Sequence, residues 1–253
     1  MLTLITHFFN EEYLLPWWCR HHRPYVDRCI LIDYDSTDRS AEIIKKLCPE
    51  WEVIVSRNRD FNAANNTQEV QDLEHSLTGW RIALNVTEFL VGDYNILKEK
   101  TTPMRTVVPI LGFVDDHCIR ESADPDQPLY KQITSGYPIE ESFQTLCMGR
   151  SLHNYNFFYD NPGRHYPATH HPNFVIFKYQ FAPMTKELIQ RKLQIQTRIP
   201  ESDRLSGAGW HHTNKLKGLT EPDVIEMWKE KRTTMVDLTD YMRYYLNLNG
   251  IEF

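Results

Sequence analysis

Two short acidic segments, each directly after an apolar run, carry the side chains of this sequence best suited to chemistry. An Asn-Glu-Glu segment at residues 10–12 follows the apolar run at residues 2–6, and residues 33–38 follow the run at residues 29–32. Continuous apolar runs are typical of buried parallel strands, and ligands of open α/β sheets bind beyond the carboxyl ends of such strands. These carboxylates are therefore placed to accept hydrogen bonds from hydroxyl groups or from a base edge. Alternatively, residues 33–38 form only a turn and a helix cap.

The elements that must position these segments alternate along the first half of the chain. Alternating strands and helices predict a mostly parallel sheet with helices on both faces. Pro16 interrupts the first helix, so this helix either starts there or bends. The patterns predict strands near residues 2–6, 28–33, 52–56, 81–85 and 106–113, and helices near residues 12–22, 39–48 and 62–76.

The second half of the chain is less regular. Residues 115–170 are rich in Pro, Asn, Gly and aromatic side chains, and ordered segments of this length without periodic pattern are usually functional. Within them we expect short strands near residues 129–134 and 154–159. Beyond them, residues 185–196 are predicted to form a helix, and residues 221–246 one long or broken helix.

The two acidic segments together resemble a known signature. The sequence FNEE…LIDYDSTDRSAEII is similar to the amino-terminal nucleotide-binding signature of family 2-like glycosyltransferases with the GT-A fold. In that family an N-E-E loop follows the first strand, and a D-x-G-S-T-D loop follows the second. Asp35 stands here where the family usually has Gly. The match is specific over residues 2–47 and weaker through about residue 92.

The resemblance implies a single GT-A (Rossmann-like) α/β domain over residues 1–253, with an irregular acceptor-side region and a C-terminal helix. Residues 1–114 would bind the nucleotide-sugar, UDP- or GDP-linked, and residues 115–253 would form the acceptor side. The sugar would be transferred to a hydroxyl of a glycan or related acceptor. The implied nucleotide-binding residues are Phe9, Asn10, Glu12, Asp33, Asp35 and Asp38.

A third acidic position, Glu88, follows the strand at residues 81–85. In the family this place usually reads D-x-D and holds a divalent metal on the sugar diphosphate, but here Asn85 and Thr87 replace the aspartates. Three interpretations stay open. In the first, Glu88 and oxygens of Asn85 or Thr87 hold Mn2+ or Mg2+, which prefer oxygen ligands. In the second, Arg, Lys or His side chains replace the metal on the diphosphate. In the third, the chain binds its ligand without catalysis.

Paired histidines are further candidates. His211 and His212, after a glycine-rich turn, resemble the late His that completes the metal or diphosphate site in many GT-A enzymes; the alternative is a loop His packed on a neighbouring Trp. His170 and His171 are candidates for binding the acceptor or, alternatively, the phosphates. The aromatic residues from Tyr155 onward are a candidate surface for sugar stacking.

A general base is required only if the transfer inverts the anomeric centre, because the acceptor hydroxyl then loses its proton during attack. Asp115 and Asp116, directly after the strand at residues 106–113, are the carboxylates best placed for this role. The alternative is that they form an ordinary polar loop after a buried strand.

Composition limits the partners. The formal net charge is -6 without a basic cluster, which argues against nucleic acid as a partner. No signal peptide and no apolar run of roughly 20 residues is visible, although peripheral membrane association stays open. Five scattered cysteines suit reduced thiols and a cytoplasmic location.

A catalytically silent nucleotide-sugar or glycan-binding protein is the main alternative to a glycosyltransferase. A nucleotidyltransferase is disfavoured, because no Gly-rich phosphate loop follows the first strand.

Overall fold

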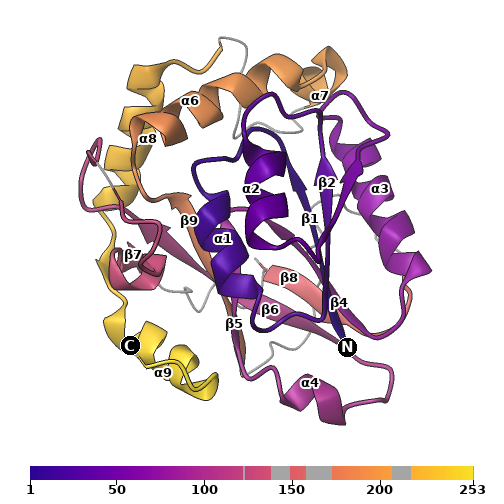
Figure 1. Ribbon diagram of the computed structural model, residues 1–253. Coiled ribbons are helices and arrows are strands. Elements are labelled where there is room, and N and C mark those ends of the chain that lie inside the picture. The colour runs from indigo at the N-terminus through magenta and orange to yellow at the C-terminus, as the bar shows by residue number, and fades with distance from the viewer. Residues whose placement is uncertain (122, 138–148, 158–172, 207–217, 253) are drawn as a thin grey trace.

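The computed structural model describes residues 1–121, 123–137, 149–157, 173–206 and 218–252. Its described strands form one large sheet in the order β10-β7-β6-β8-β4-β1-β2-β3, with β9 beside β6 and β5 beside β9 (Figure 1). The strands are β1 (Leu2–Phe8), β2 (Arg28–Asp33), β3 (Glu52–Val55), β4 (Trp80–Asn85), β5 (Glu88–Gly92), β6 (Arg105–Val114), β7 (Ser135–Tyr137), β8 (Gly149–His153), β9 (Phe174–Phe181) and β10 (Val236–Asp237).

The strands β1, β2, β3, β4, β6 and β9 run in one direction, whereas β5 and β8 run against their neighbours. This confirms the predicted α/β class with a mostly parallel sheet flanked by helices. The described helices are α1 (Leu15–His22), α2 (Ser40–Leu47), α3 (Ala63–Ser76), α4 (Ile96–Glu99), α6 (Lys186–Ile195), α7 (Glu201–Ser206), α8 (Glu221–Arg232) and α9 (Thr239–Leu248), with 3-10 turns η1 (Leu129–Lys131) and η2 (Gln196–Arg198).

Alternating side chains of the central strands fill two separate cores. Leu31 of β2 packs with Trp18 of α1 and with Ile44 of α2 on one face. Its neighbour Ile30 packs with Val70 of α3 on the other face. Because successive side chains of a strand point to opposite faces, an apolar run without polar interruptions lets helices cover both sides.

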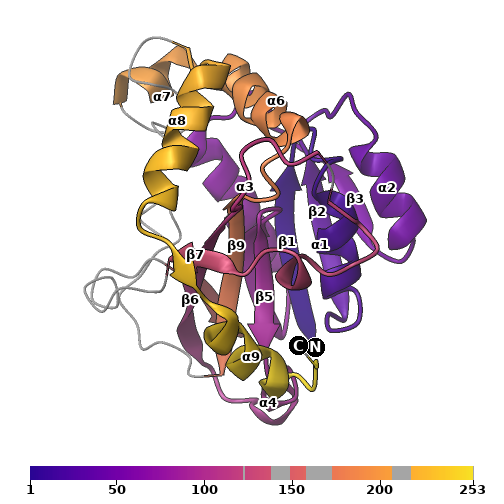
Figure 2. The same ribbon diagram turned by 90° about the vertical axis from the view of Figure 1, so that its left-hand side faces the viewer.

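Helix α6 lies across the carboxyl ends of β1 and β2, and α4 lies at the opposite end of the sheet (Figure 1 and Figure 2). Helix α1 is fixed to β5 by hydrogen bonds, one of which joins Nε2 of His21 to the carbonyl of Leu90 at 2.8 Å. The indole of Trp18 donates to the carbonyl of Glu88 at 2.9 Å, and the amide of Leu90 donates to Nε2 of His22 at 3.1 Å. Pro16 sits in the first turn of α1, so the helix starts there and does not bend.

Most predicted elements of the first half are confirmed to within a few residues, but two strand predictions are wrong. Residues 129–134 form η1 and a turn, because Pro128 cannot continue a ladder and the segment is tied by Gln132 to the carbonyl of Asp124. For the strand predicted near residues 154–159, the structure instead has β8 at Gly149–His153 and no strand at residues 154–157, while residues 158–159 lie outside the described residues. The helix predicted at residues 221–246 is broken into α8 and α9 by β10.

No helix within the described ranges is long and apolar enough to cross a membrane. Three cysteines, Cys19, Cys29 and Cys48, are buried without a disulfide, whereas Cys118 is exposed. The prediction of reduced thiols agrees with these four residues.

Candidate functional site

The loops after β1 and β2 are joined to each other through Asn10. Its Oδ1 accepts the amide of Thr37 at 2.7 Å, its Nδ2 donates to Oγ1 of Thr37 at 3.2 Å, and its own amide donates to Oγ of Ser36 at 3.1 Å. Asn10 has φ 50, a left-handed conformation that Asn tolerates better than most residues. The side chain therefore fixes the two loops at the sheet edge.

Glu12 and Asp38 complete this connection. The amide of Glu12 donates to Oδ2 of Asp38 at 3.0 Å, and the amide of Ser40 donates to its Oδ1 at 2.9 Å. In return, the backbone amide and Nε of Arg39 donate to Glu12 at 3.1 Å. Asp38 thus accepts the first amide of α2 and also holds the neighbouring loop, whereas the N-cap residue itself is Arg39, which has no side-chain cap.

Asp33 and Asp35 are less engaged. Asp33, half-buried at the tip of β2, accepts the amide of Ser36 at 2.9 Å through Oδ1. Asp35 is exposed and has φ 65. A left-handed residue explains why the similar glycosyltransferase signature usually has Gly here, and Asp is among the few other residues that accept this conformation.

Phe9 contributes packing. It is 8% exposed and lies in the core on the α3 side of the sheet. Its ring contacts Phe61 with centroids 5.8 Å apart, and the guanidinium of Arg198 lies 4.6 Å from its centre. Because the Phe9 ring packs against these two neighbours, it supports the loop after β1 from within the core and does not face a ligand.

Helix α6 is docked on the loop after β1. Arg191 donates through Nε to Oε1 of the buried Glu11 at 2.6 Å, and Gln194 accepts from Nδ2 of Asn10 at 3.0 Å. Glu11 belongs to the recognised acidic segment, whereas Arg191 carried no signal in the sequence. The contact brings α6 and its next residue, Lys192, to the tips of the parallel strands.

Glu88 is fully buried at the start of β5 and is held by two cations. Arg150 donates through Nε at 2.8 Å and through Nη2 at 2.7 Å, one bond to each carboxylate oxygen. The ammonium of Lys178 lies 3.6 Å away, and the amide of Asn85 donates at 2.9 Å. Burial alone would raise the pKa of Glu88, but Arg150 and Lys178 lower it to about 2.

This arrangement does not fit a divalent cation on Glu88. Both oxygens are already engaged by a guanidinium, and a metal there would face two further positive charges at short range. The side chain of Asn85 also turns toward Glu88, with Nδ2 3.4 Å from Oε1. Within the described residues there is no group of three or more His, Cys, Asp or Glu that would hold a metal. His211 and His212 lie outside the described residues.

The two base candidates differ sharply. Asp115 is fully buried and accepts two hydrogen bonds from Arg120, at 2.7 and 2.8 Å, and one from the amide of Met184 at 3.0 Å. This carboxylate anchors the end of β6 and is not available as a base. Asp116 is half-buried and accepts from Oγ of Ser135 at 3.1 Å, so it is the candidate that the geometry leaves open.

Tyr155 lies away from the other candidates. It follows His153, which pairs with Arg81 at the start of β4 and with Arg105 at the start of β6. The tip of β4 at Asn85 is four residues further along, about 13 Å at ~3.3 Å per residue. Tyr155 therefore lies near the end of β4 opposite to Asn85, and its role in sugar stacking stays a prediction. His170 and His171 fall outside the described residues.

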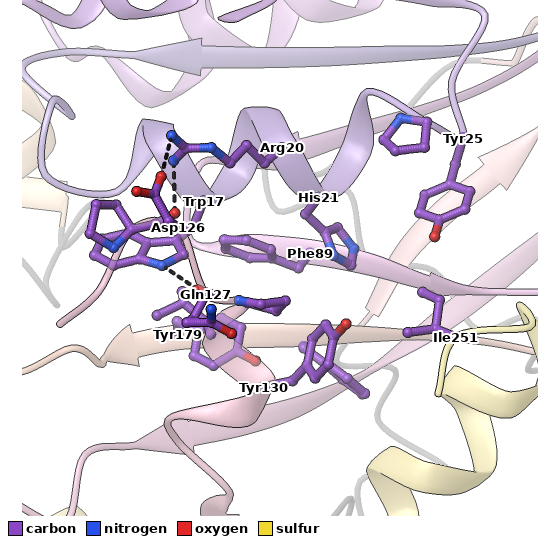
Figure 3. Close-up of a pocket in the computed structure, with 15 residues that line it drawn as sticks. Trp17, Arg20, His21, Tyr25, Phe89, Asp126, Gln127, Tyr130, Tyr179 and Ile251 are labelled. Atoms are coloured by element: carbon purple, nitrogen blue, oxygen red, sulfur yellow. Dashed lines mark hydrogen bonds and ion pairs between the residues drawn. The ribbon is translucent and has the colours of Figure 1, made fainter. Parts of the chain in front are cut away.

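A cavity of about 200 Å³ opens on the other face of β5 and β9. Figure 3 shows Trp17, His21 and Tyr25 of the α1 region facing Tyr130 across it. Phe89 and Tyr179 line this cavity, whereas their neighbours Glu88 and Lys178 point to the opposite face because strand side chains alternate. The cavity is thus separated by the sheet from the carboxylates and cations described above.

Comparison with known proteins finds similarity among solved structures but not among family profiles or curated proteins. No protein-family profile and no curated protein matches the sequence. Among solved structures, PcManGT, a mannosyltransferase from Pyrobaculum calidifontis in complex with GDP-Man and Mn2+, overlaps with a TM-score of 0.44 at 11% identity, covering 92% of this chain and 74% of that chain. S. aureus TarS 1-349 overlaps with a TM-score of 0.42 at 9% identity, covering 85% and 72%. Similarities this low do not by themselves assign an activity.

Proposed function

We propose that the chain is a glycosyltransferase that moves a sugar from a UDP- or GDP-linked donor to a hydroxyl of a glycan or related acceptor. The observation that carries this proposal is the convergence of three strand ends. Asp33 is in register with Phe8 of β1, and Asn85 is in register with His7. The residues of the recognised signature therefore share one edge of the sheet, where ligands of open α/β sheets bind.

In this function the loops after β1 and β2 bind the nucleoside, with Asp33 and Asp35 as the carboxylates free to accept from base and ribose. The diphosphate lies toward β4, β5 and α6. The bond between the anomeric carbon and the donor oxygen breaks, and its electrons remain on the leaving diphosphate. The acceptor oxygen forms the new bond and loses its proton, which Asp116 accepts if the reaction inverts the anomeric centre.

The experiment is a calorimetric titration of UDP and GDP, followed by transfer and donor-hydrolysis assays with each nucleotide-sugar. Asp33→Ala weakens nucleotide binding, whereas the matched control Asp240→Ala, at an exposed position on α9, leaves binding unchanged. Glu88→Ala is a poor probe of catalysis, because it removes the carboxylate that the cations Arg150 and Lys178 contact and so disturbs the fold as well. Absence of binding for every nucleoside diphosphate would refute the proposal.

A second candidate is a silent binding protein of the same fold. It is favoured by the engaged carboxylate of Glu88 and by Asn85 and Thr87 where the similar family has aspartates. Nucleotide binding without turnover of any donor, with or without Mn2+, would select this candidate over the enzyme.

A further inference from the structure

Three lysines from three separate elements gather between the β1 tip and the β5 start. Lys178 belongs to β9, Lys192 to α6 and Lys231 to α8. The ammonium of Lys192 lies 4.0 Å from the centre of the Phe181 ring, and that of Lys231 lies 6.0 Å from the same ring. Lys178 and Lys231 are both close enough to lower the pKa of Lys192. The three ammonium groups therefore form one cluster.

The carboxylates beside this cluster are already neutralised. Glu88 is paired in two bonds with Arg150, and Glu11 is paired with Arg191. Within the part of the chain that the structure describes, no carboxylate forms an ion pair with Lys192 or Lys231, although Glu11 attracts Lys192 and the exposed Glu230 attracts Lys231 at longer range. Lys178 lies 3.6 Å from Glu88 but shares this carboxylate with Arg150. The three lysines with Arg150 and Arg191 therefore face only the two carboxylates Glu88 and Glu11, which leaves an excess of positive charge.

Uncompensated charge is unusual where it is buried. Lys192 is only 9% exposed, and an ammonium removed from water normally has a carboxylate or another acceptor beside it. Like charges held together in a medium of low dielectric also repel more strongly than in water. A polyvalent anion bound among them would remove both costs, and ammonium groups are well suited to phosphate oxygens.

We propose that Lys178, Lys192 and Lys231 form a pyrophosphate site that binds the diphosphate of the donor directly, in place of a divalent cation on Glu88. The assignment of this diphosphate to a nucleotide-sugar rests on the proposed function; the anion site itself does not. Arg150 has a positioning role, because it neutralises Glu88 and so leaves the charge of Lys178 available.

The test is a calorimetric titration of inorganic pyrophosphate into the full chain in the presence of EDTA. Pyrophosphate binds the parent chain, and Lys192→Met and Lys231→Met each weaken binding about tenfold, as expected for the loss of one charge-assisted hydrogen bond. Lys229→Met is the matched control, since Lys229 lies on α8 but pairs with Glu226 at 3.2 Å on the exposed surface; it binds like the parent. Circular dichroism verifies that each variant is folded, and Lys231→Met serves if the buried Lys192 variant is not.

Pyrophosphate binding that requires Mn2+, or binding unchanged in both lysine variants, would overturn the inference. UDP and GDP titrated in parallel separate this result from the fate of the proposed function. Nucleotides that bind while pyrophosphate does not overturn only the lysine site. Pyrophosphate that binds while no nucleotide does supports the lysine site and refutes the glycosyltransferase.

Discussion

Lys192 is a residue whose ionisation is strongly altered by its surroundings. Burial lowers its pKa first, and Arg191 and Lys178 lower it further, to about 7, against the opposing effect of Glu11. Lys231 on α8 adds to the same effect. An anion bound beside this group favours the ammonium form and raises its pKa again, so that binding takes up a proton.

We therefore predict that pyrophosphate affinity is highest below pH 7 and falls as the pH rises from about 7 toward the ordinary lysine value of 10.5. Calorimetry in buffers of different ionisation enthalpy will measure the proton uptake in this range. In Lys192→Met the uptake due to this ammonium disappears, and only the pH dependence that comes from the ionisation of pyrophosphate itself remains. If the parent chain takes up no proton on binding pyrophosphate, the lowered pKa of Lys192 is contradicted.

Asp115 and Asp116 are adjacent in sequence but have different environments, which gives a second prediction. Asp115→Asn breaks the buried pair with Arg120 and lowers the free energy of unfolding by about 3–5 kcal/mol. Asp116→Asn, which loses only one bond to Ser135, costs about 1 kcal/mol. If Asp116 is the base, its variant also lowers turnover by a factor of about 100 or more. Urea unfolding and a transfer assay separate the two effects, and equal stability of the two variants would contradict this interpretation.

At the scale of elements, the loop pair after β1 and β2 depends on Asn10. Asn10→Ala removes its bonds to Thr37 and Gln194 and places Ala at a positive φ. We predict a loss of about 2 kcal/mol in unfolding free energy together with weaker nucleotide binding. Asn10→Asp keeps the acceptor for the Thr37 amide and loses less. Asn95→Ala, at an Asn that contacts the exposed Lys98, is the control, and an Asn10→Ala as stable as this control would disprove the role.

The elements explain which parts of the site the sequence could predict. Apolar runs locate β1, β2 and β4, and the local spacing of Asn10 and Asp33 then determines where the acidic loops fall. The partner of Glu88 could not be predicted in this way, because Arg150 lies in β8, whose sequence GRSLH has no strong strand pattern. Its burial comes from β4 and β6 on either side.

The lysine cluster was missed for a related reason. Each lysine is unremarkable within its own helix or strand, and only the packing of α6, α8 and β9 brings them together. A signal did exist for Lys178, which interrupts the otherwise apolar FVIFKYQF of β9. A charged residue in the middle of a buried strand requires a partner, but the sequence does not identify that partner as Glu88.

At the scale of the whole molecule, strands from both halves of the chain belong to the same sheet. β8 of the second half lies between β4 and β6, and β9 joins β6 to β5. We predict that thermal unfolding is a single transition by circular dichroism and by tryptophan fluorescence. Pyrophosphate at 100 times its dissociation constant should add about 2.7 kcal/mol to the free energy of unfolding and so raise the temperature of this transition. In Lys192→Met the gain should fall to about 1.4 kcal/mol at the same pyrophosphate concentration, because a tenfold weaker affinity leaves the ligand at about ten times its dissociation constant. Two separate transitions would contradict the shared sheet.

Because the net charge of the chain is -6, the lysine cluster can attract an anion only at short range. Long-range attraction between this chain and an anion is weak, because the total charge repels it, so recognition depends on groups within about 8 Å at physiological ionic strength. This agrees with a small diphosphate rather than an extended polyanion as the ligand.

The exposed thiol of Cys118 offers a practical opportunity. It lies three residues beyond Asp115, past the end of β6, whereas the thiols of Cys19, Cys29 and Cys48 are shielded by the core. Among these four cysteines a maleimide dye would react at Cys118, next to the rim where donor and acceptor are expected to meet. A change in its emission on adding a sugar nucleotide would then follow occupancy in real time without altering any of the side chains discussed above.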